Sequence, residues 1–395
     1  MSAVASDFDD YSPDACDLCG STDYHEVLRR HGRVMTSDSR IVAGNLVKVQ
    51  CDTCGLVRSG AAIDSQSLEE LYVERYQLAL TAESAEPVFQ TPQGPVARSE
   101  AIARWIVEGY AQTGKPTPHR VLDVGCSEGR VLTALRKAWP DASLVGLEPN
   151  AAAADQARRR GVDILEGGYQ SATGSYDLVY SVAVLEHVPS PSHFVDRLVS
   201  LLASDGVLLL MQPCQEDLSH DLLFMDHLHH FYLPHVAWLG AKKGLSVVAE
   251  RLRNPLLPHF SMHVFSGESS AVASFESNID FHERIAENVR QWTARFERLD
   301  GWLSATPGAD LYVWGVGEFF TLLKAYTRFG SEIIAGAFDN NLARYRDAGF
   351  NFSVALPPDD LRLVKGRLLL TFKTNDALKQ RIEAAALPWF SPLVD

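Results

Sequence analysis

One stretch of the 395-residue chain, residues 119–150, constrains the fold more than any other. An apolar segment, Val121 to Val124, ends in a loop of small residues, 125–129, and a helical pattern follows. A second apolar segment, 143–147, delivers Glu148 at its end. This order predicts a β-α-β unit in an open α/β sheet, with a ligand site at the carboxyl ends of the strands. Glycine lets a ligand approach the backbone, and an acid about 20 residues past the loop can bind ribose hydroxyls.

The glycine spacing separates two classes of nucleoside cofactor. A dinucleotide fingerprint needs G-x-G-x-x-G, whereas this loop reads Asp123-Val-Gly-Cys-Ser-Glu-Gly129 and has G-x-x-x-G. The loop resembles motif I of the class I S-adenosylmethionine-dependent methyltransferases, with Ser127 in place of the family's middle glycine. The resemblance implies that Asp123 and the loop backbone face the methionine part of the cofactor and that Glu148 holds the ribose. Another α/β nucleotide-binding protein with the same geometry is the alternative.

Two later segments extend this expected core over 116–266. Tyr169 follows a third strand, at a place where the family often puts groups beside the adenine. The run 177–182 predicts a buried strand, and Leu185-Glu-His-Val-Pro189 after it resembles motif IV of the same family. His187 there is either a general base, a substrate ligand or a structural residue. We expect the cofactor to contact Asp123, Gly125, Cys126, Glu128, Gly129, Glu148, Pro149, Tyr169 and Ser181.

The net charge and the hydropathy of the chain limit the classes of partner that it is expected to bind. The net charge is −14 and the pI about 5.4, which disfavours a nucleic-acid backbone because such binding relies on Lys and Arg. Apolar runs are strand-sized, so no membrane span is expected. The acidic N-terminus lacks the order of a signal peptide. We therefore expect a cytoplasmic protein with a small-molecule substrate.

Four of the six cysteines form two C-x-x-C pairs, Cys16/Cys19 and Cys51/Cys54, each followed by glycine. Two such pairs predict a closed, tetrahedral four-cysteine zinc site in a module over 12–60. Redox-active dithiols are the alternative, but those normally begin a helix in a thioredoxin-like unit. The zinc is expected to be structural, because four thiolates leave no open position.

A histidine-dense segment, 220–235, follows the core strands. Acid/base or substrate-binding work, packing and a metal site are the three interpretations. The whole layout resembles the sugar C-methyltransferases that act on nucleotide-linked deoxysugars, whose Tyr-His-Glu-His-like segment matches Phe224-Met-Asp-His227 here. The resemblance implies that Asp226 and His227, together with His187, are catalytic. We expect His230 and Tyr232 to bind substrate.

The remaining segments are expected to position substrate. Residues 61–115 predict a helical lid or linker, in which Tyr72 and Tyr76 could cover the cofactor. A long helix over about 269–304 is expected to bridge two α/β domains, with a coiled-coil partner role as the rival. A second β-α-β unit carries Gly315, Gly317 and, at the ribose-acid position, Asp339. Because Phe320 stands where a dinucleotide loop needs glycine, NAD binding is not expected, and these three residues are predicted to bind a nucleotide handle of the substrate.

The predicted fold is thus α/β: a Rossmann-like class I methyltransferase core, an N-terminal zinc-binding module and a second, C-terminal Rossmann-like domain. The expected boundaries are 12–60, 61–115, 116–266, 267–306 and 307–395. The predicted function is C-methylation of a nucleotide-linked sugar in secondary-metabolite or polysaccharide biosynthesis. Alternatives are O- or N-methylation of another natural product, a macromolecular methyltransferase, and a non-catalytic cofactor-binding scaffold.

Overall fold

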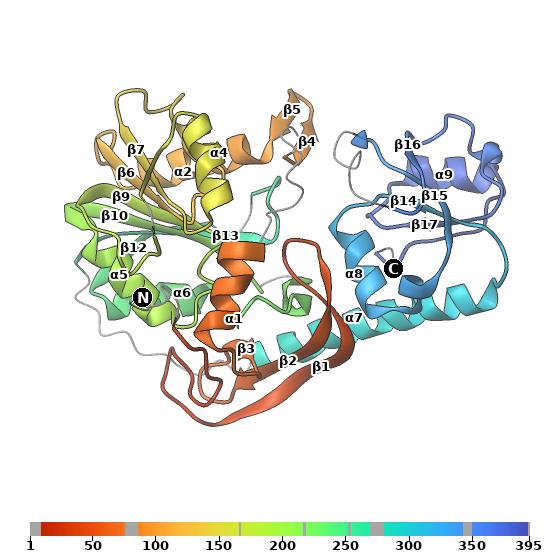
Figure 1. Cartoon of the computed structure of the whole chain (residues 1–395), viewed down its shortest axis with the longest axis horizontal. Helices are drawn as coiled ribbons and strands as arrows, with labels where there is room; N and C mark the ends of the chain where they lie inside the picture. The colour runs from red at the N-terminus through yellow and green to blue at the C-terminus, as the bar shows by residue number, and fades with distance from the viewer. Residues whose placement is uncertain are drawn as a thin grey trace, which may run out of the picture.

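The computed structural model describes residues 9–75, 86–165, 167–215, 219–251, 254–268, 280–342 and 350–393. Its largest sheet has seven strands in the order β12-β13-β10-β9-β6-β7-β8 (Figure 1). The central strands are parallel: β6 (Arg120–Val124), β7 (Ser143–Leu147), β8 (Asp163–Leu165), β9 (Tyr176–Val182) and β10 (Leu202–Pro213). β13 (Phe260–Glu268) is antiparallel to β10 and to β12 (Leu245–Arg251). The strand order reverses between β6 and β9, which places a ligand crevice at their carboxyl ends.

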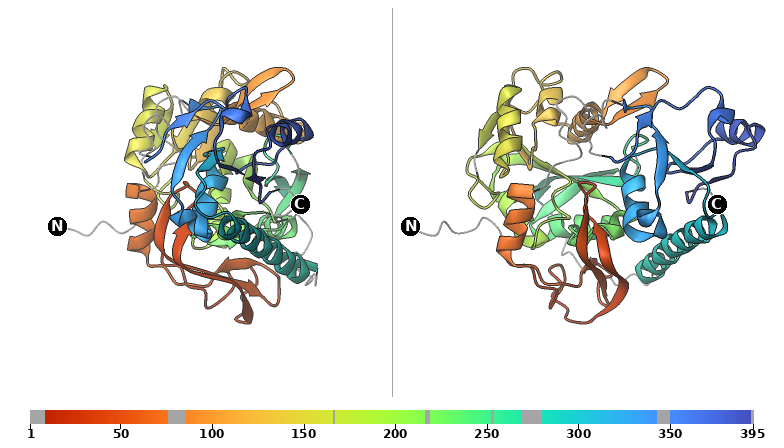
Figure 2. Two further views of the ribbon diagram at one scale, coloured as in Figure 1. Left: turned by 90° about the vertical axis from the view of Figure 1, so that its right-hand side faces the viewer. Right: turned by 45° about the vertical axis from the view of Figure 1, so that its right-hand side comes forward.

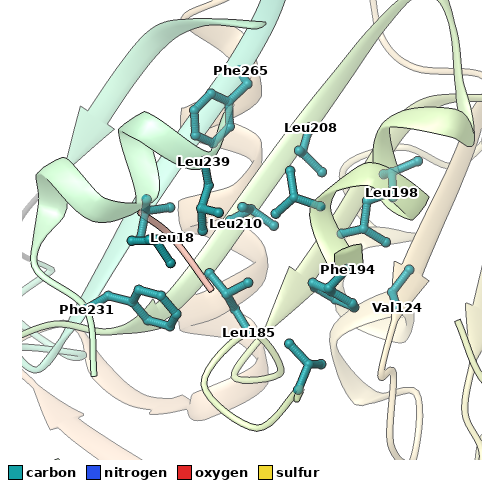
Figure 3. Close-up of a cluster of buried hydrophobic side chains, with 14 of the residues drawn as sticks. Leu18, Val124, Leu185, Phe194, Leu198, Leu208, Leu210, Phe231, Leu239 and Phe265 are labelled. Atoms are coloured by element: carbon teal, nitrogen blue, oxygen red, sulfur yellow. The ribbon is translucent and has the colours of Figure 1, made fainter. Parts of the chain in front are cut away.

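Helices cover both faces of this sheet because the strand residues alternate in direction. On one face Leu208 and Leu210 join Phe194 of α5 (Pro191–Ser200) and Leu239 of α6 (Leu233–Lys242) (Figure 3). On the other face Val121 and neighbouring strand residues pack against α2 (Arg98–Ala111), α3 (Arg130–Leu135) and α4 (Ala151–Arg159). Helix α2 therefore belongs to the core, although it lies inside the segment expected to be a lid or linker.

The N-terminal module is built on a long antiparallel hairpin, β1 (Tyr24–Met35) and β2 (Ile41–Cys51). The sheet continues through β3 (Val57–Ser59) to β11 (His229–His230), so its last strand comes from the histidine-dense segment. Leu18, between the first two cysteines, is buried in the methyltransferase core beside Leu185 and Leu239 (Figure 3). The module and the core therefore share one hydrophobic cluster.

A short helical segment connects the module to the core. It comprises α1 (Ser65–Glu69), whose N-terminus Asp64 caps, and the π-helical turn η1 (Glu70–Arg75). The hairpin of β4 (Val88–Thr91) and β5 (Gly94–Ala97) precedes α2. Tyr72 lies in the π-helical turn, whereas Tyr76 lies outside the described residues.

A long helix and a second α/β sheet complete the chain. Helix α7 (Asp280–Ala305) runs from the module to the C-terminal sheet (Figure 2). Its Phe281 and Ile285 pack with Val57 of the module, and its Leu299 and Leu303 pack with Leu311 of the C-terminal sheet. The helix therefore contacts both parts, and residues 269–279 of the predicted helix lie outside the described ranges. The C-terminal sheet has five parallel strands: β16 (Val354–Ala355), β15 (Ile334–Phe338), β14 (Leu311–Trp314), β17 (Arg367–Leu370) and β18 (Trp389–Phe390).

Further helical elements are α8 (Glu318–Tyr326) and α9 (Asp376–Ala384), with the 3-10 turns η2 (Asp221–Leu223), η3 (Arg328–Ser331) and η5 (Leu361–Leu363). Among the described residues, none of the helices has the length and apolar character needed to cross a membrane.

Candidate functional site

The loop after β6 has the backbone geometry that nucleoside binding requires. Gly125 and Gly129 have φ angles of +80° and +71°, a region that glycine adopts without steric cost. The N–H groups of Gly125 and Cys126 donate to the Leu147 carbonyl at 2.9 and 3.1 Å, which draws the loop onto the end of β7. A Cβ atom on Gly125 would lie 2.5 Å from a methyl of Val184, so the close approach also needs glycine.

Glu148 lies directly opposite this loop. Its carboxylate accepts hydrogen bonds from the backbone N–H groups of Ser127, at 2.8 Å, and Asn150, at 2.9 Å. Burial raises its pKa, although these two N–H groups oppose the rise. A half-buried carboxylate at the end of the second strand is placed as a ribose ligand requires.

Asp123 occupies the end of β6, next to the cofactor loop. It is buried, its carboxylate accepts a hydrogen bond from the Tyr180 hydroxyl at 2.9 Å, and burial raises its pKa to about 8. Ser181 is also buried and pairs with Val124 across β9 and β6. A positively charged ligand at this edge would compensate the buried carboxylate, which suits the sulfonium and ammonium groups of S-adenosylmethionine.

The other predicted cofactor residues have more varied surroundings. Glu128 is paired with Arg130, the first residue of α3, and with Arg160, which follows α4, so two arginines hold its carboxylate. Cys126 is buried against Gly146, whose added Cβ would lie 2.4 Å from its sulfur. Tyr169 packs edge-to-face on Phe194 at 4.9 Å, and Pro149 follows Glu148 at the rim. The carboxylate of Glu128 and the thiol of Cys126 thus both have partners within the protein.

Tyr72 links the cofactor edge to the histidine-dense segment. The side chain of Asn150, two residues after Glu148, donates to the carbonyl of Val73 at 2.9 Å. The Tyr72 hydroxyl lies 2.9 Å from Nδ1 of His187 and donates to the carbonyl of Asp226 at 2.9 Å. Tyr72, which was predicted to cover the cofactor, therefore lies next to both the cofactor edge and the histidine-dense segment.

A buried carboxylate organises two of the histidines. Asp221 contacts Nδ1 of His227 through one oxygen, and Nδ1 of His230 through the other at 2.5 Å. The side chain of Gln215 donates to the second oxygen at 2.7 Å. Burial disfavours a charge on His227, but the Asp221 carboxylate outweighs that effect and raises its pKa to about 9.

His187 has the opposite character. Its Nδ1 lies 3.1 Å from the carbonyl of Asp226, which can only accept, so Nδ1 carries the proton in that contact and Nε2 the lone pair. Burial lowers its pKa to about 4, with the nearby His227 acting in the same direction. The His187 and His227 rings are perpendicular, with centroids 4.6 Å apart. Glu186, also buried, has a pKa raised to about 8 by burial.

Asp226, predicted to be catalytic, is held by the tip of the module hairpin. Its carboxylate accepts from the Ser37 backbone N–H at 2.8 Å and from the Ser37 hydroxyl at 2.6 Å. One of its oxygens lies 3.9 Å from Nδ1 of His187. The carboxylate that contacts His227 directly is therefore that of Asp221, a residue that sequence reasoning missed.

Lys48 was also missed, although the sequence carries a signal for it. It lies on β2 between the buried Leu46 and Gln50, at the inward position of a period-two alternation. Its ammonium donates to the His227 carbonyl at 2.5 Å, and burial lowers its pKa to about 8. The signal for Asp221 is weaker, since it is only an acid within a histidine-dense run.

Other residues of this segment have structural surroundings. Tyr232, expected to bind substrate, stacks on Phe281 of α7 with ring centroids 4.4 Å apart. Nδ1 of His235 accepts from the Tyr232 backbone N–H, so its Nε2–H donates to the Cys54 carbonyl at 2.8 Å. We therefore place Tyr232 with the packing of α7, and His230 with the Asp221 cluster.

The four predicted metal ligands converge. The sulfur atoms of Cys16, Cys19, Cys51 and Cys54 all lie within 4.8 Å of one another. Two of the distances are 3.6 Å (Cys16 to Cys54) and 3.5 Å (Cys19 to Cys51), close to the edge of about 3.8 Å in a tetrahedron with Zn–S bonds of about 2.3 Å. None of the four is paired in a disulfide, and this soft sulfur donor set suits zinc.

The C-terminal sheet repeats the loop-and-acid geometry of the first site. Gly315, with φ of +95°, donates to the Phe338 carbonyl at 2.8 Å. Asp339 accepts from the N–H groups of Val316 at 3.0 Å and Asn341 at 2.9 Å. This pattern matches that of Glu148, with Gly317 capping α8. Glu318, the first residue of α8, contacts the His220 ring, which ties this loop to the histidine-dense segment.

Comparisons with known proteins agree with the topology of the core. Residues 97–250 match the family model described as a methyltransferase domain. A trans-aconitate 2-methyltransferase of Rhodopseudomonas palustris is 34% identical over 118 residues, which is 29% of this chain and 46% of that protein. A protein of the same name from Deinococcus radiodurans is 34% identical over 108 residues, covering 26% and 42%. The matched stretch thus spans less than half the length of these relatives.

Among solved structures, magnesium protoporphyrin IX methyltransferase from Synechocystis with bound SAH aligns at 17% identity and a TM-score of 0.35. The alignment covers 42% of this chain and 81% of that one. The family match, the strand order and the loop-and-acid geometry together make the region around residues 97–250 a class I S-adenosylmethionine-dependent methyltransferase domain.

Proposed function

We propose that this chain transfers the methyl group of S-adenosylmethionine to a small acceptor, and that the acceptor is a nucleotide-linked sugar methylated on carbon. The observation that carries the proposal is a pair of buried imidazoles, His187 and His227, whose perpendicular rings have centroids 4.6 Å apart. Their surroundings push their pKa values in opposite directions, to about 4 and about 9. Such divergence is the signature of a paired base and acid. Tyr72 joins the pair to the cofactor edge.

Carbon methylation next to a carbonyl uses both groups. S-adenosylmethionine supplies an activated methyl group, so the protein must hold acceptor and donor in line and move a proton. His187, neutral at pH 7, accepts the proton from the acceptor carbon through Nε2. His227, as imidazolium, donates a hydrogen bond to the enolate oxygen and stabilises its charge. The carbon–methyl bond forms as the sulfur–methyl bond breaks.

A two-part acceptor explains the second α/β sheet. Asp339 and the Gly315 loop reproduce the geometry of a ribose-binding edge, and Glu318 joins that loop to His220 of the histidine-dense segment. A nucleotide bound there would place its attached sugar toward His227. The net charge of −14 makes a polynucleotide a poorer fit than a single nucleotide handle.

We propose zinc as the metal of the four-cysteine cluster, in a structural role. Four buried or half-buried thiols at tetrahedral spacing leave no position open for substrate. The metal would fix two tight turns whose neighbours, Leu18 and the Cys54 carbonyl, contact the methyltransferase core and His235.

O-methylation is the second candidate function, favoured by the names of the curated relatives, which are methyltransferases of a small acid. It needs a base but no enolate-stabilising acid. A scaffold that only binds the cofactor is the third.

The test incubates the full-length protein with S-adenosylmethionine and a panel of nucleotide-linked keto-sugars, with trans-aconitate in a parallel reaction. Mass spectrometry and NMR of the product identify the methylated atom. We expect a new carbon–methyl group on a nucleotide-linked sugar. Asp339→Asn should raise the KM for that acceptor about 10-fold and leave the KM for S-adenosylmethionine unchanged. Methylation of trans-aconitate alone would favour the second function, and cofactor binding without any transfer the third.

A further inference from the structure

Asp221 joins the side chains of the histidine-dense segment through hydrogen bonds, although no role was predicted for it from the sequence. It is 3% exposed and lies in the 3-10 turn η2. One carboxylate oxygen contacts Nδ1 of His227, and the other contacts Nδ1 of His230 at 2.5 Å and the Gln215 amide at 2.7 Å. One buried carboxylate thus serves two imidazoles.

This arrangement defines which nitrogen of each ring is protonated. An ionised carboxylate only accepts hydrogen bonds, so Nδ1 of both His227 and His230 must carry a proton. The reactive nitrogen of each ring is then Nε2. A carboxylate that orients an imidazole through Nδ1–H in this way sets its tautomer and increases its basicity.

The two imidazoles cannot both be charged. A single carboxylate balances one positive charge, and a second buried imidazolium would remain uncompensated. The neighbouring charges distinguish the two rings, because the Lys48 ammonium disfavours a proton on His230, whereas the carboxylate of Asp226 favours a proton on His227. Accordingly, the pKa of His230 falls to about 4 through burial and the influence of Lys48.

We propose that Asp221 is a positioning residue that makes His227 the proton-bearing imidazole of the site and holds His230 neutral. The inference rests on the proposed function in one respect, since it assigns His227 the task of donating to the acceptor oxygen. The division of charge between the two rings is a property of the protein itself and is measurable without any acceptor.

Charged and titratable groups approach His227 from several elements. They are Asp221, Asp226 and His230 from its own segment, Glu186 and His187 from the loop after β9, Lys48 from β2 and Glu318 from α8. Of these, Asp221 contacts the ring of His227 through a hydrogen bond to Nδ1. Removing its charge should therefore change the titration of His227 more than removing any other.

The test is an NMR titration of the full-length protein labelled with 15N-histidine, with His227→Gln and His230→Gln used to assign the two rings. In the wild type we expect His227 to lose its proton near pH 9 and His230 to stay neutral, with Nδ1–H, down to about pH 4. In Asp221→Asn we expect the midpoint of His227 to fall by about 2 pH units. Asp226→Asn, whose carboxylate is held by Ser37, is the matched control and should shift it less.

A wild-type midpoint for His227 at or below about 6.5, or a charged His230 at neutral pH, would overturn the inference, and so would an unchanged midpoint in Asp221→Asn. The wild-type titration decides the matter if the variant does not fold. With an acceptor in hand, Asp221→Asn should lower kcat and move the alkaline limb of the pH profile downward, while the KM for S-adenosylmethionine stays constant. If His227 and His230 titrate as expected but no acceptor is methylated, the proposed function is rejected and the role of Asp221 remains supported.

Discussion

Ser37 donates twice to the carboxylate of Asp226, through its backbone N–H at 2.8 Å and its hydroxyl at 2.6 Å. The two residues belong to different parts of the chain, a hairpin tip of the N-terminal module and the histidine-dense segment. Lys48 of the same hairpin donates to the carbonyl of His227. The module therefore contacts the histidine-dense segment directly, in addition to containing the four cysteines.

Ser37→Ala should show how much the contact between Ser37 and Asp226 contributes to the free energy of unfolding. Loss of the hydroxyl leaves one oxygen of a buried carboxylate without that donor, which costs about 1.5 kcal/mol of unfolding free energy. Chemical denaturation measures the change. Ser12→Ala, whose hydroxyl bonds the exposed Asp14, is the control and should change stability by less than about 0.5 kcal/mol. Equal effects of the two substitutions would contradict the assigned contact.

Glu148→Gln should weaken cofactor binding. The substitution removes the negative charge that we propose accepts hydrogen bonds from the ribose hydroxyls, so we expect the Kd for S-adenosylhomocysteine to rise about 10- to 100-fold in calorimetry. Glu128→Gln, in the facing loop after β6, provides a matched control, because its carboxylate is paired with Arg130 and Arg160. Similar losses in both variants would mean that the acid at the end of β7 has no special part in binding.

The pH dependence of kcat/KM should be bell-shaped. His187 must be neutral to accept a proton, so activity rises as the pH climbs through about 4. His227 must be charged to donate, so activity falls as the pH climbs through about 9. The same sign holds for stability: the charge on His227 stabilises the fold fully below its unfolded pKa and ceases to do so through about pH 9. His227→Gln should lack the alkaline limb; a profile identical to that of the wild type would remove His227 from the mechanism.

Removal of the metal should destabilise the site as well as the module. Leu18 is buried in the core, and His235 bonds the Cys54 carbonyl, so collapse of the cysteine turns should disturb both. We expect one zinc ion per chain by elemental analysis, and a melting temperature lowered by several degrees in Cys51→Ser. Cys214→Ala lies outside the cluster and should keep its zinc. Full metal content in Cys51→Ser would refute the four-cysteine assignment.

Features that depend on short sequence patterns could be predicted from the sequence. The β-α-β order around Gly125 and Glu148 follows from apolar strands, small residues and an acid at fixed spacing, and the core shows that order. The convergence of the four cysteines likewise follows from two C-x-x-C pairs. The β-α-β unit depends on residues close together in the sequence. The cysteine cluster depends on the tetrahedral arrangement that four thiolates adopt around one metal ion.

The histidine-dense segment could not be predicted in the same way. Sequence similarity drew attention to Asp226, whereas the structure places Asp221 against His227 and binds Asp226 to Ser37. Tyr232 was expected to face substrate, yet it stacks on Phe281 of a helix about 50 residues away. Contacts of this kind depend on how β11 joins the sheet of the module, a long-range pairing that hydropathy does not encode.

The most direct test of the account follows the labelled methyl group of S-adenosylmethionine during incubation of the full-length protein with a nucleotide-linked keto-sugar. We predict that the label appears on a carbon of the sugar, and that His187→Gln lowers the rate at least about 100-fold while cofactor affinity is unchanged. Label on oxygen, or equal transfer by wild type and His187→Gln, would contradict the account.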